Sequence, residues 1–145
     1  MPIIHDDEFR AWEACAPDSF RADPVWRFHA YRVALYLTDL ASSDAAHVIG
    51  RSGARGSPDQ MVRAVESVST NIAEGFGRSH RADRSRFFGI ALGSLRESVT
   101  CYRTMRNDLP AGVADRRFDQ LAELRRIIIG ARKWLAAKPQ HSQLS

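Results

Sequence analysis

A polar stripe between Ser57 and Arg78 carries side chains that could take part in acid–base chemistry. Apolar residues recur through this stretch at three- and four-residue spacing, which predicts a helix with one apolar face. At about 100° per residue, the other face carries Arg63, Ser67, Asn71, Glu74 and Arg78. Glu97, in a later helical stretch, could pair with Glu74 as the two carboxylates of an acid–base site.

Other kinds of catalytic or metal site lack the residue spacing that they need. A di-metal helical bundle requires histidines three residues after glutamates, and neither helix that carries Glu74 or Glu97 has one. The five histidines are scattered, and Cys15 and Cys101 are isolated. The sequence contains no serine-hydrolase elbow and no glycine-rich cofactor motif. We therefore expect no metal, no cofactor and no enzymatic activity.

A second group of candidate residues is the densest positive charge in the chain, where the predicted second helix gives way to the third. Its members are Arg78, Arg81, Arg84 and Arg86, with His80 among them. Guanidinium groups bind phosphates in a bidentate way, and the formal charge of +4 with a pI near 9.6 suits an anionic partner. The alternative is a solvated bundle end, partly neutralised by Glu74 and Asp83.

The polar stripe also has a structural interpretation. Glu74 precedes Arg78 by four residues, the favourable order for an ion pair on a helix. Ser67 and Asn71 are short enough to hydrogen-bond across to Ser94 or Glu97 on the next helix. We expect these residues to form a buried polar seam at a boundary between subunits.

Two glycines on the third helix extend this seam. Gly89 and Gly93 lie four residues apart beside the apolar Ile90, and an interior glycine costs roughly 1 kcal/mol relative to alanine. Glycines in such positions usually mark a close approach of another backbone. The pair predicts a helix–helix contact, either within the bundle or between subunits. The complete seam is Arg63, Ser67, Asn71, Glu74, Gly89, Gly93, Ser94 and Glu97.

Four long helices with short connections must position these residues. The first is expected to start at Asp23-Pro24, and residues 45–56 form the loop after it. The second runs from Ser57 to about Arg78, the third ends at a turn over 107–112, and the last spans about 115–137. The predicted fold is all-α, an antiparallel up-down four-helix bundle. Residues 1–22 are a short helical appendage, 23–138 the bundle and 139–145 a polar tail.

The first long helix has more apolar surface than one bundle needs. Beside its core stripe it carries a second apolar stripe of Phe28, Tyr31 and Leu35. Either the N-terminal segment or another subunit must cover this stripe. The N-terminal segment, with a predicted helix over 6–16, has three apolar anchors of its own, and we expect it to dock on the bundle. The anchors are Phe9, Trp12 and Phe20.

Composition narrows the class of protein. A chain of 145 residues is one domain with a sizeable core, and no apolar run is long enough to cross a membrane. The first seven residues are acidic and lack the apolar core of a secretion signal. Two isolated cysteines suit a reducing compartment. We expect a cytoplasmic protein without a membrane partner.

Several of these residues together resemble the signature of a bacterial four-helix-bundle family. They are Arg63-Ala64, Ser67, the run from Asn71 to Arg78, and the run from Ile90 to Glu97. The chain resembles the 23S rRNA intervening-sequence proteins and, through them, the accessory variability proteins of diversity-generating retroelements. The resemblance covers about residues 24–137 and is weaker in the first helix and the connection after it. It implies a homopentamer without established catalytic activity, which binds nucleic acid or a nucleic-acid enzyme.

Two functions follow as expectations. The first is a non-catalytic homo-oligomer that binds RNA or DNA through its arginines, and a ring of five chains would multiply a modest charge per chain. The alternative is a scaffold that binds a nucleic-acid-processing protein such as a reverse transcriptase, without touching nucleic acid itself. Binding that weakens steeply with salt distinguishes the first function from the second.

Overall fold

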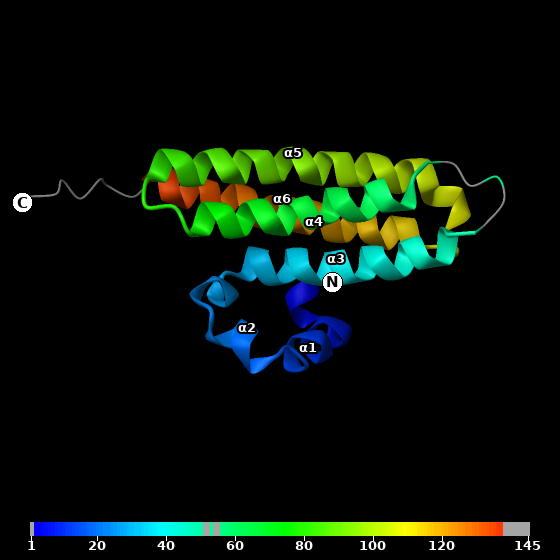
Figure 1. The fold of residues 1–145 in the computed structure, drawn as a ribbon, viewed down its shortest axis with the longest axis horizontal. Helices are drawn as coiled ribbons and strands as arrows, with labels where there is room; N and C mark the ends of the chain where they lie inside the picture. Colours follow the sequence, from blue (N-terminus) through cyan, green and yellow to red (C-terminus); the bar gives the residue numbers. More distant parts are fainter. Residues whose placement is uncertain (1, 51–52, 54–55, 138–145) are drawn as a thin grey trace, which may run out of the picture.

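Helices account for nearly all of the regular structure in this chain (Figure 1). The computed structural model describes residues 2–50, 53 and 56–137, and within these ranges it contains helices and no strand. The predicted all-α fold is confirmed. The predicted polar tail, residues 139–145, lies outside the described residues.

Four long helices form an antiparallel bundle. They are α3 (His29–Val48), α4 (Pro58–Phe76), α5 (Arg81–Met105) and α6 (Val113–Ala137), and they alternate in direction along the long axis of the molecule (Figure 1). Each packs against the next in the chain, and α6 closes the bundle against α3. Buried aliphatic side chains from all four helices fill the centre, among them Val33, Val65, Val68, Ile72, Leu95, Leu124 and Ile128.

The start of α4 is set by local signals that the sequence shows. The Ser57 hydroxyl accepts a hydrogen bond from the backbone N–H of Gln60 at 3.2 Å, and Pro58 occupies the first helical position. Buried residues then follow at helical spacing as far as Ile72. The helix ends at Phe76, two residues before the predicted end.

The first long helix starts later than predicted. Asp23 does cap a helical turn, because its carboxylate accepts a hydrogen bond from the N–H of Val25 at 3.0 Å. That turn is a short 3-10 helix, η2 (Pro24–Arg27), and Phe28 after it is extended, with φ −83° and ψ 108°. The Arg32 guanidinium donates to the carbonyl of Trp26 at 2.7 Å, which ties η2 to α3.

The same helix also ends later than predicted. The sequence predicts residues 45–48 to lie in the connecting loop, but they belong to α3. Ala45 and Val48 are buried, so burial of their side chains continues the core stripe by one turn. The backbone leaves the helix at Ile49, and Gly50 follows with a positive φ of 84°, which glycine adopts readily.

The turn between α5 and α6 closes the far end of the bundle. The short 3-10 helix η3 (Arg106–Asp108) follows α5, and α6 begins at Val113, two residues before its predicted start. Val113 and Ala114 are buried, which extends the core face of α6 to its first residues.

The N-terminal appendage folds back against the bundle, as expected. It consists of η1 (Ile3–His5), α1 (Asp7–Ala14) and α2 (Asp18–Ala22), which lie beside α3 (Figure 1). Phe9 is fully buried and packs edge-on against Tyr36, with ring centroids 5.3 Å apart. The backbone N–H of Ile3 donates to the carboxylate of Glu123 at 2.9 Å, so the appendage also contacts α6.

Two of the three expected anchors dock. Besides Phe9, the indole of Trp12 stacks on Trp26 at 5.9 Å and donates a hydrogen bond to Asp39 at 2.7 Å. Phe20 does not dock, because 54% of its surface remains exposed. Both docked anchors therefore belong to α1, and α2 lies at the periphery.

The appendage covers little of the second apolar stripe of the first helix, and reaches it at Tyr31, which lines a hollow together with Ser19 and Phe20. The appendage packs on the side of α3 that carries His29 and Tyr36. Phe28 packs instead between Phe76 and Phe88, at centroid distances of 6.2 and 5.7 Å. Tyr31 and Leu35 remain partly buried beside a shallow hollow against α4.

Among the described helices, none combines the length and the apolar content that a bilayer span requires.

Candidate nucleic-acid interface

The predicted arginine cluster lies at one end of the bundle, around the turn that joins α4 to α5. In Figure 1 this end also contains the start of α3 and the end of α6. Arg78 lies in the turn, and Arg81, Arg84 and Arg86 lie in the first turns of α5. Segments from four parts of the chain therefore meet around the charge.

Phe87 supports two of these arginines. The guanidinium of Arg78 lies 4.9 Å from the centre of the Phe87 ring, and that of Arg86 lies 4.6 Å from it. Both distances are within the range of a cation–π contact. One partly buried ring therefore holds two positive charges at the surface, a role for Phe87 that the sequence analysis does not predict.

Acidic neighbours only partly offset this charge. Arg78 pairs with Glu74 at 3.3 Å, as predicted, and Arg86 pairs with Asp83 at 3.8 Å. All four side chains are about half exposed, so water screens both pairs and each is worth little. The two guanidiniums stay accessible to an external anion.

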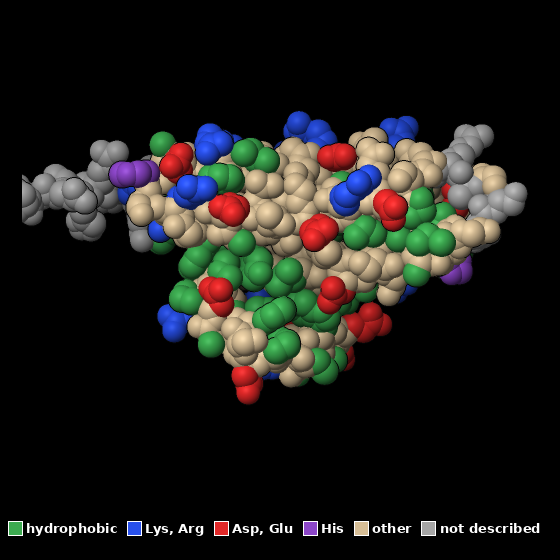
Figure 2. Space-filling view, in the orientation of Figure 1, with side chains coloured by type: hydrophobic (Ala, Val, Ile, Leu, Met, Phe, Trp, Pro, Cys, Tyr) green, Lys and Arg blue, Asp and Glu red, His purple; other side chains and the backbone are tan. Residues whose placement is uncertain are grey.

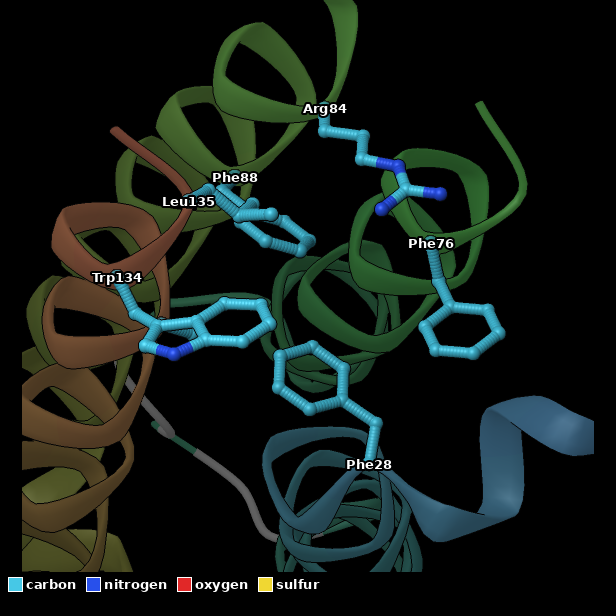
Figure 3. Close-up of a pocket in the computed structure, with 7 residues that line it drawn as sticks. Phe28, Phe76, Arg84, Phe88, Trp134 and Leu135 are labelled. Carbon is cyan, nitrogen blue, oxygen red and sulfur yellow. The ribbon is translucent and has the colours of Figure 1, made fainter. Parts of the chain in front are cut away.

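Arg84 differs from its neighbours because it reaches over an apolar hollow (Figure 3). Its Nε donates to the backbone carbonyl of Arg78 at 2.5 Å, which fixes the side chain across the α4–α5 turn. The hollow has a volume of about 120 Å³. It is lined by Phe28, Phe76, Arg84, Phe88, Ala131, Trp134 and Leu135.

A glycine allows α4 and α5 to approach each other beside this hollow. A Cβ added to Gly75 would lie 2.9 Å from a ring carbon of Phe88 and 3.0 Å from the Cβ of Phe87. Real Cβ atoms essentially never come so close to a neighbour. Gly75 thus sets the position of the two phenylalanines that support the arginines and the hollow.

Two members of the predicted polar seam bond to each other between α4 and α5, and other members have partners that differ from those expected. Ser67 and Ser94 share a hydrogen bond of 2.8 Å between their hydroxyls, as anticipated. Asn71 bonds back to the carbonyl and hydroxyl of Ser67, at 2.8 and 3.1 Å, rather than across to α5. Glu97 accepts a bond of 3.4 Å from Gln60. In this single chain Ser67, Asn71 and Ser94 are partly buried, whereas Arg63, Glu74 and Glu97 are exposed.

The carboxylates of Glu74 and Glu97 do not form a pair. Ser67 and Ser94 lie opposite each other, and the two helices are antiparallel. Glu74 is seven residues from this point toward one end of the bundle, and Glu97 is three residues from it toward the other. At 1.5 Å per residue the two carboxylates are about 15 Å apart along the axis. The hypothesis of an acid–base site that uses the carboxylates of Glu74 and Glu97 together is therefore wrong.

The two seam glycines have different surroundings. A Cβ at Gly89 would lie 3.2 Å from the guanidinium of Arg132 on α6. A Cβ at Gly93 would meet no atom of the described chain within 4 Å, so no backbone of this chain approaches it closely. The exposed Ile90 lies one turn away, with 42% of its surface accessible.

A buried charged cluster near the other end of the bundle was missed by sequence analysis. Asp44, on α3, accepts hydrogen bonds from the Tyr102 hydroxyl at 2.6 Å and from the Arg117 guanidinium at 2.8 and 3.2 Å. The exposed fractions of Asp44 and Arg117 are only 7% and 8%. The available signal was their register, because each occupies a position of its helix that otherwise carries core residues.

Burial and charge shift the proton affinities in this cluster. Burial and the hydrogen bond to Asp44 raise the pKa of Tyr102 well above its ordinary value. Burial alone lowers the pKa of Arg117, but the hydrogen bond and charge of Asp44 outweigh it and raise that pKa. The tyrosine stays neutral and the arginine charged, so the cluster joins α3, α5 and α6 without offering a free acid or base.

Charge is distributed unevenly over the molecule. Helices α5 and α6 together contain eleven Arg and Lys residues and five Asp and Glu residues. Residues 1–22, α3 and α4 together contain four Arg and Lys residues and ten Asp and Glu residues. Figure 2 shows Arg and Lys side chains along the edge formed by α5, and acidic side chains on the appendage and the neighbouring helices. The appendage therefore gives one side of the molecule an acidic surface.

Among the described residues, no group of three or more His, Cys, Asp and Glu side chains is placed to hold a metal ion.

Comparison with known protein families shows which family the chain belongs to. A family model described as 23S rRNA-intervening sequence protein matches residues 46–130, more than half of the sequence. The chain belongs to this family. A search of curated proteins found no match. The part of this intervening-sequence protein that matches runs from the end of α3 into α6 and contains the polar seam and all four clustered arginines. The appendage and Trp134 lie outside it.

Proposed function

We propose that this intervening-sequence protein is a non-catalytic, cytoplasmic homo-oligomer that binds RNA or DNA. Arg78, Arg81, Arg84 and Arg86 are the phosphate-binding residues. The observation that carries this proposal is the presentation of the cluster, with two guanidiniums held over the Phe87 ring at the surface and Arg84 fixed beside them. Preorganised arginines lose less side-chain entropy when they bind phosphate.

The other parts of the proposal have their own support. The separation of Glu74 from Glu97 removes the carboxylate pair that favoured acid–base catalysis. The two cysteines are free thiols, which suits a reducing compartment. The exposed Ile90 and the open surface at Gly93 suit a subunit contact along the α4–α5 seam. A ring of five chains, which the family resemblance implies, would bring five arginine clusters into one particle.

Nucleic-acid binding is tested by titrating labelled RNA and DNA with the protein at several salt concentrations. In one variant Arg78, Arg81, Arg84 and Arg86 are changed to Gln. In the matched control the exposed arginines Arg96, Arg103, Arg125 and Arg126 are changed to Gln. Both variants lose four charges, so they weaken the long-range field alike. Only the first removes the phosphate contacts.

We expect the unmodified protein to bind with an affinity that falls steeply with salt. Each phosphate contact contributes about 0.7 to 0.9 to the slope of log affinity against log salt, so the first variant should lower the slope by about 3. The control should leave it nearly unchanged. Equal losses in both variants contradict the assigned residues. No binding at low salt, together with salt-resistant binding of a partner protein, supports the scaffold hypothesis instead.

A further inference from the structure

The hollow beside Arg84 is built from four separate segments of the chain (Figure 3). Phe28 comes from the residue before α3, Phe76 from the end of α4, Phe88 from α5, and Trp134 with Leu135 from the last turns of α6. Phe88 and Leu135 are buried and form its base, with 3% and 7% of their surfaces exposed. In Figure 3 the rings of Phe28, Phe88 and Trp134 point toward a common space.

Two of the lining aromatic residues are exposed to an unusual degree. Trp134 exposes 57% of its surface and Phe76 exposes 36%. The large apolar side chains exposed elsewhere in the described chain, such as Phe20 and Ile90, lie apart from this hollow. Exposed aromatic rings gathered around a hollow indicate a binding surface.

The size of the hollow limits what it can accept. Pockets for cofactors and drug-sized molecules usually enclose roughly 300 to 1,000 Å³. A volume of about 120 Å³ is too small for such a ligand and suits one ring-sized group. The aromatic walls favour a flat group, because aromatic surfaces bind a planar ring by stacking.

The charge at the rim limits the ligand further. Among the described residues that line the hollow, Arg84 is the one with a charged side chain. Arg78 and Arg86 lie at the same end of the bundle and are held over Phe87. The complementary ligand is a flat, largely apolar ring connected to negative charge. An unpaired nucleobase with its phosphate has this chemistry, and recognition of unpaired bases commonly combines aromatic rings with arginine.

We infer that the hollow binds an unpaired nucleobase of RNA or DNA. Trp134 and Phe76 stack against the base, and Arg84 holds the neighbouring phosphate. This inference rests on the proposed function and deepens it, because it assigns a preference for single-stranded over duplex nucleic acid. In a duplex the bases are stacked within the helix and only the phosphates are available to the arginines.

The test compares four oligonucleotides with equal numbers of phosphates per strand. They are a uridine RNA strand, a thymidine DNA strand, an abasic DNA strand, and a duplex. The protein variants are Trp134→Ala, Trp134→Phe and Phe76→Ala. Phe20→Ala is the matched control, because Phe20 is another exposed phenylalanine and is not among the residues that line the hollow.

The unmodified protein should bind the uridine and thymidine strands about tenfold more tightly than the abasic strand, since stacking on one base is worth roughly 1 to 3 kcal/mol. Trp134→Ala should remove most of this preference and leave binding of the abasic strand unchanged. Phe76→Ala should reduce it, Trp134→Phe should retain it, and Phe20→Ala should have no effect. A preference for the uridine strand alone identifies RNA as the ligand, and equal preferences show that the ring shared by uracil and thymine is recognised whichever sugar carries it.

Two results overturn the inference while the proposed function survives. One is binding of all four oligonucleotides with equal affinity, which shows that phosphates alone are recognised. The other is a fall in the native mass of Trp134→Ala, which shows that the hollow is a contact between subunits. If the unmodified protein binds none of the oligonucleotides, the result contradicts the proposed nucleic-acid binding itself, and the inference with it.

Discussion

At the scale of single residues, the buried Asp44 has a large consequence for stability. Its carboxylate is buried and accepts hydrogen bonds from α5 and α6 together. Removing one partner of a buried ion pair leaves the other charge uncompensated, which costs far more than the pair itself contributes. The arginine on α6 exposes only 8% of its surface.

We therefore expect Asp44→Ala to lower the free energy of unfolding by about 3 to 5 kcal/mol, measured by urea denaturation. The control is Glu74→Ala, which breaks the half-exposed pair with Arg78 and should cost less than about 1 kcal/mol. Similar losses in the two variants would show that Arg117 finds other compensation.

His29 makes stability depend on pH. The burial of its ring and the nearby charge of Arg32 lower its pKa, while Glu13 and Glu123 oppose the shift. The folded chain therefore binds a proton less readily than the unfolded chain, in which the pKa is about 6.5. Its contribution to stability is present above that pH and is lost as the pH falls below it.

Unfolding measured between pH 8 and pH 5.5 should show a loss of stability that His29→Gln removes. His80→Gln, a change to an exposed histidine, is the control for the substitution itself. Parallel profiles for the unmodified protein and His29→Gln would assign the loss to other groups.

Residue contacts within one helix were predictable, and contacts between distant helices were not. The Glu74–Arg78 pair follows from four-residue spacing, and Ser67 with Ser94 follows from two short polar side chains on neighbouring helices. Asp44 and Arg117 are 73 residues apart, and no local pattern connects them. The aromatic hollow likewise depends on four segments that meet only in the folded chain.

At the scale of elements, the packing of α4 on α5 depends on Gly75. Alanine there would force its Cβ against the Cβ of Phe87 and the ring of the buried Phe88. We expect Gly75→Ala to lower the free energy of unfolding by roughly 1 to 3 kcal/mol, the cost of overpacking.

Gly130→Ala is the control, because a Cβ there meets no described atom within 4 Å. It should raise stability by up to about 1 kcal/mol. A gain in both variants would show that the two helices can separate without cost.

The existence of each long helix was evident from periodicity, whereas several boundaries were not. The Ser57-Pro58 start of α4 has a cap that is readable from sequence. The start of α3 carries a similar signal at Asp23-Pro24, but that cap serves a 3-10 turn, and Phe28 is extended so that its ring can pack on Phe76 and Phe88. Tertiary packing outweighed the local signal there.

At the scale of the whole molecule, a substitution at Gly93 tests the proposed assembly of subunits. The surface over Gly93 is open in the single chain, so a longer side chain costs the monomer nothing. At a tight contact between subunits the same side chain would collide with the neighbour. We expect light scattering to give the unmodified protein a mass near five chains of 16.3 kDa at low and high salt. Gly93→Gln should reduce this native mass.

Gly130→Gln is the matched control, because Gly130 is also an exposed glycine within a helix and lies on α6, away from the seam. It should leave the mass unchanged. A monomeric unmodified protein would contradict the assembly. Equal dissociation in the two variants would place the contact elsewhere.

The uneven distribution of charge described above has a kinetic consequence. A molecule with basic α5 and α6 and an acidic appendage has a strong dipole, so the field of a polyanion turns it before contact. Most encounters should then begin with the basic side foremost, and association should be faster than random orientation allows. Neutralising the acidic residues of the appendage would weaken this alignment and increase unproductive encounters, although none of those residues belongs to the arginine cluster.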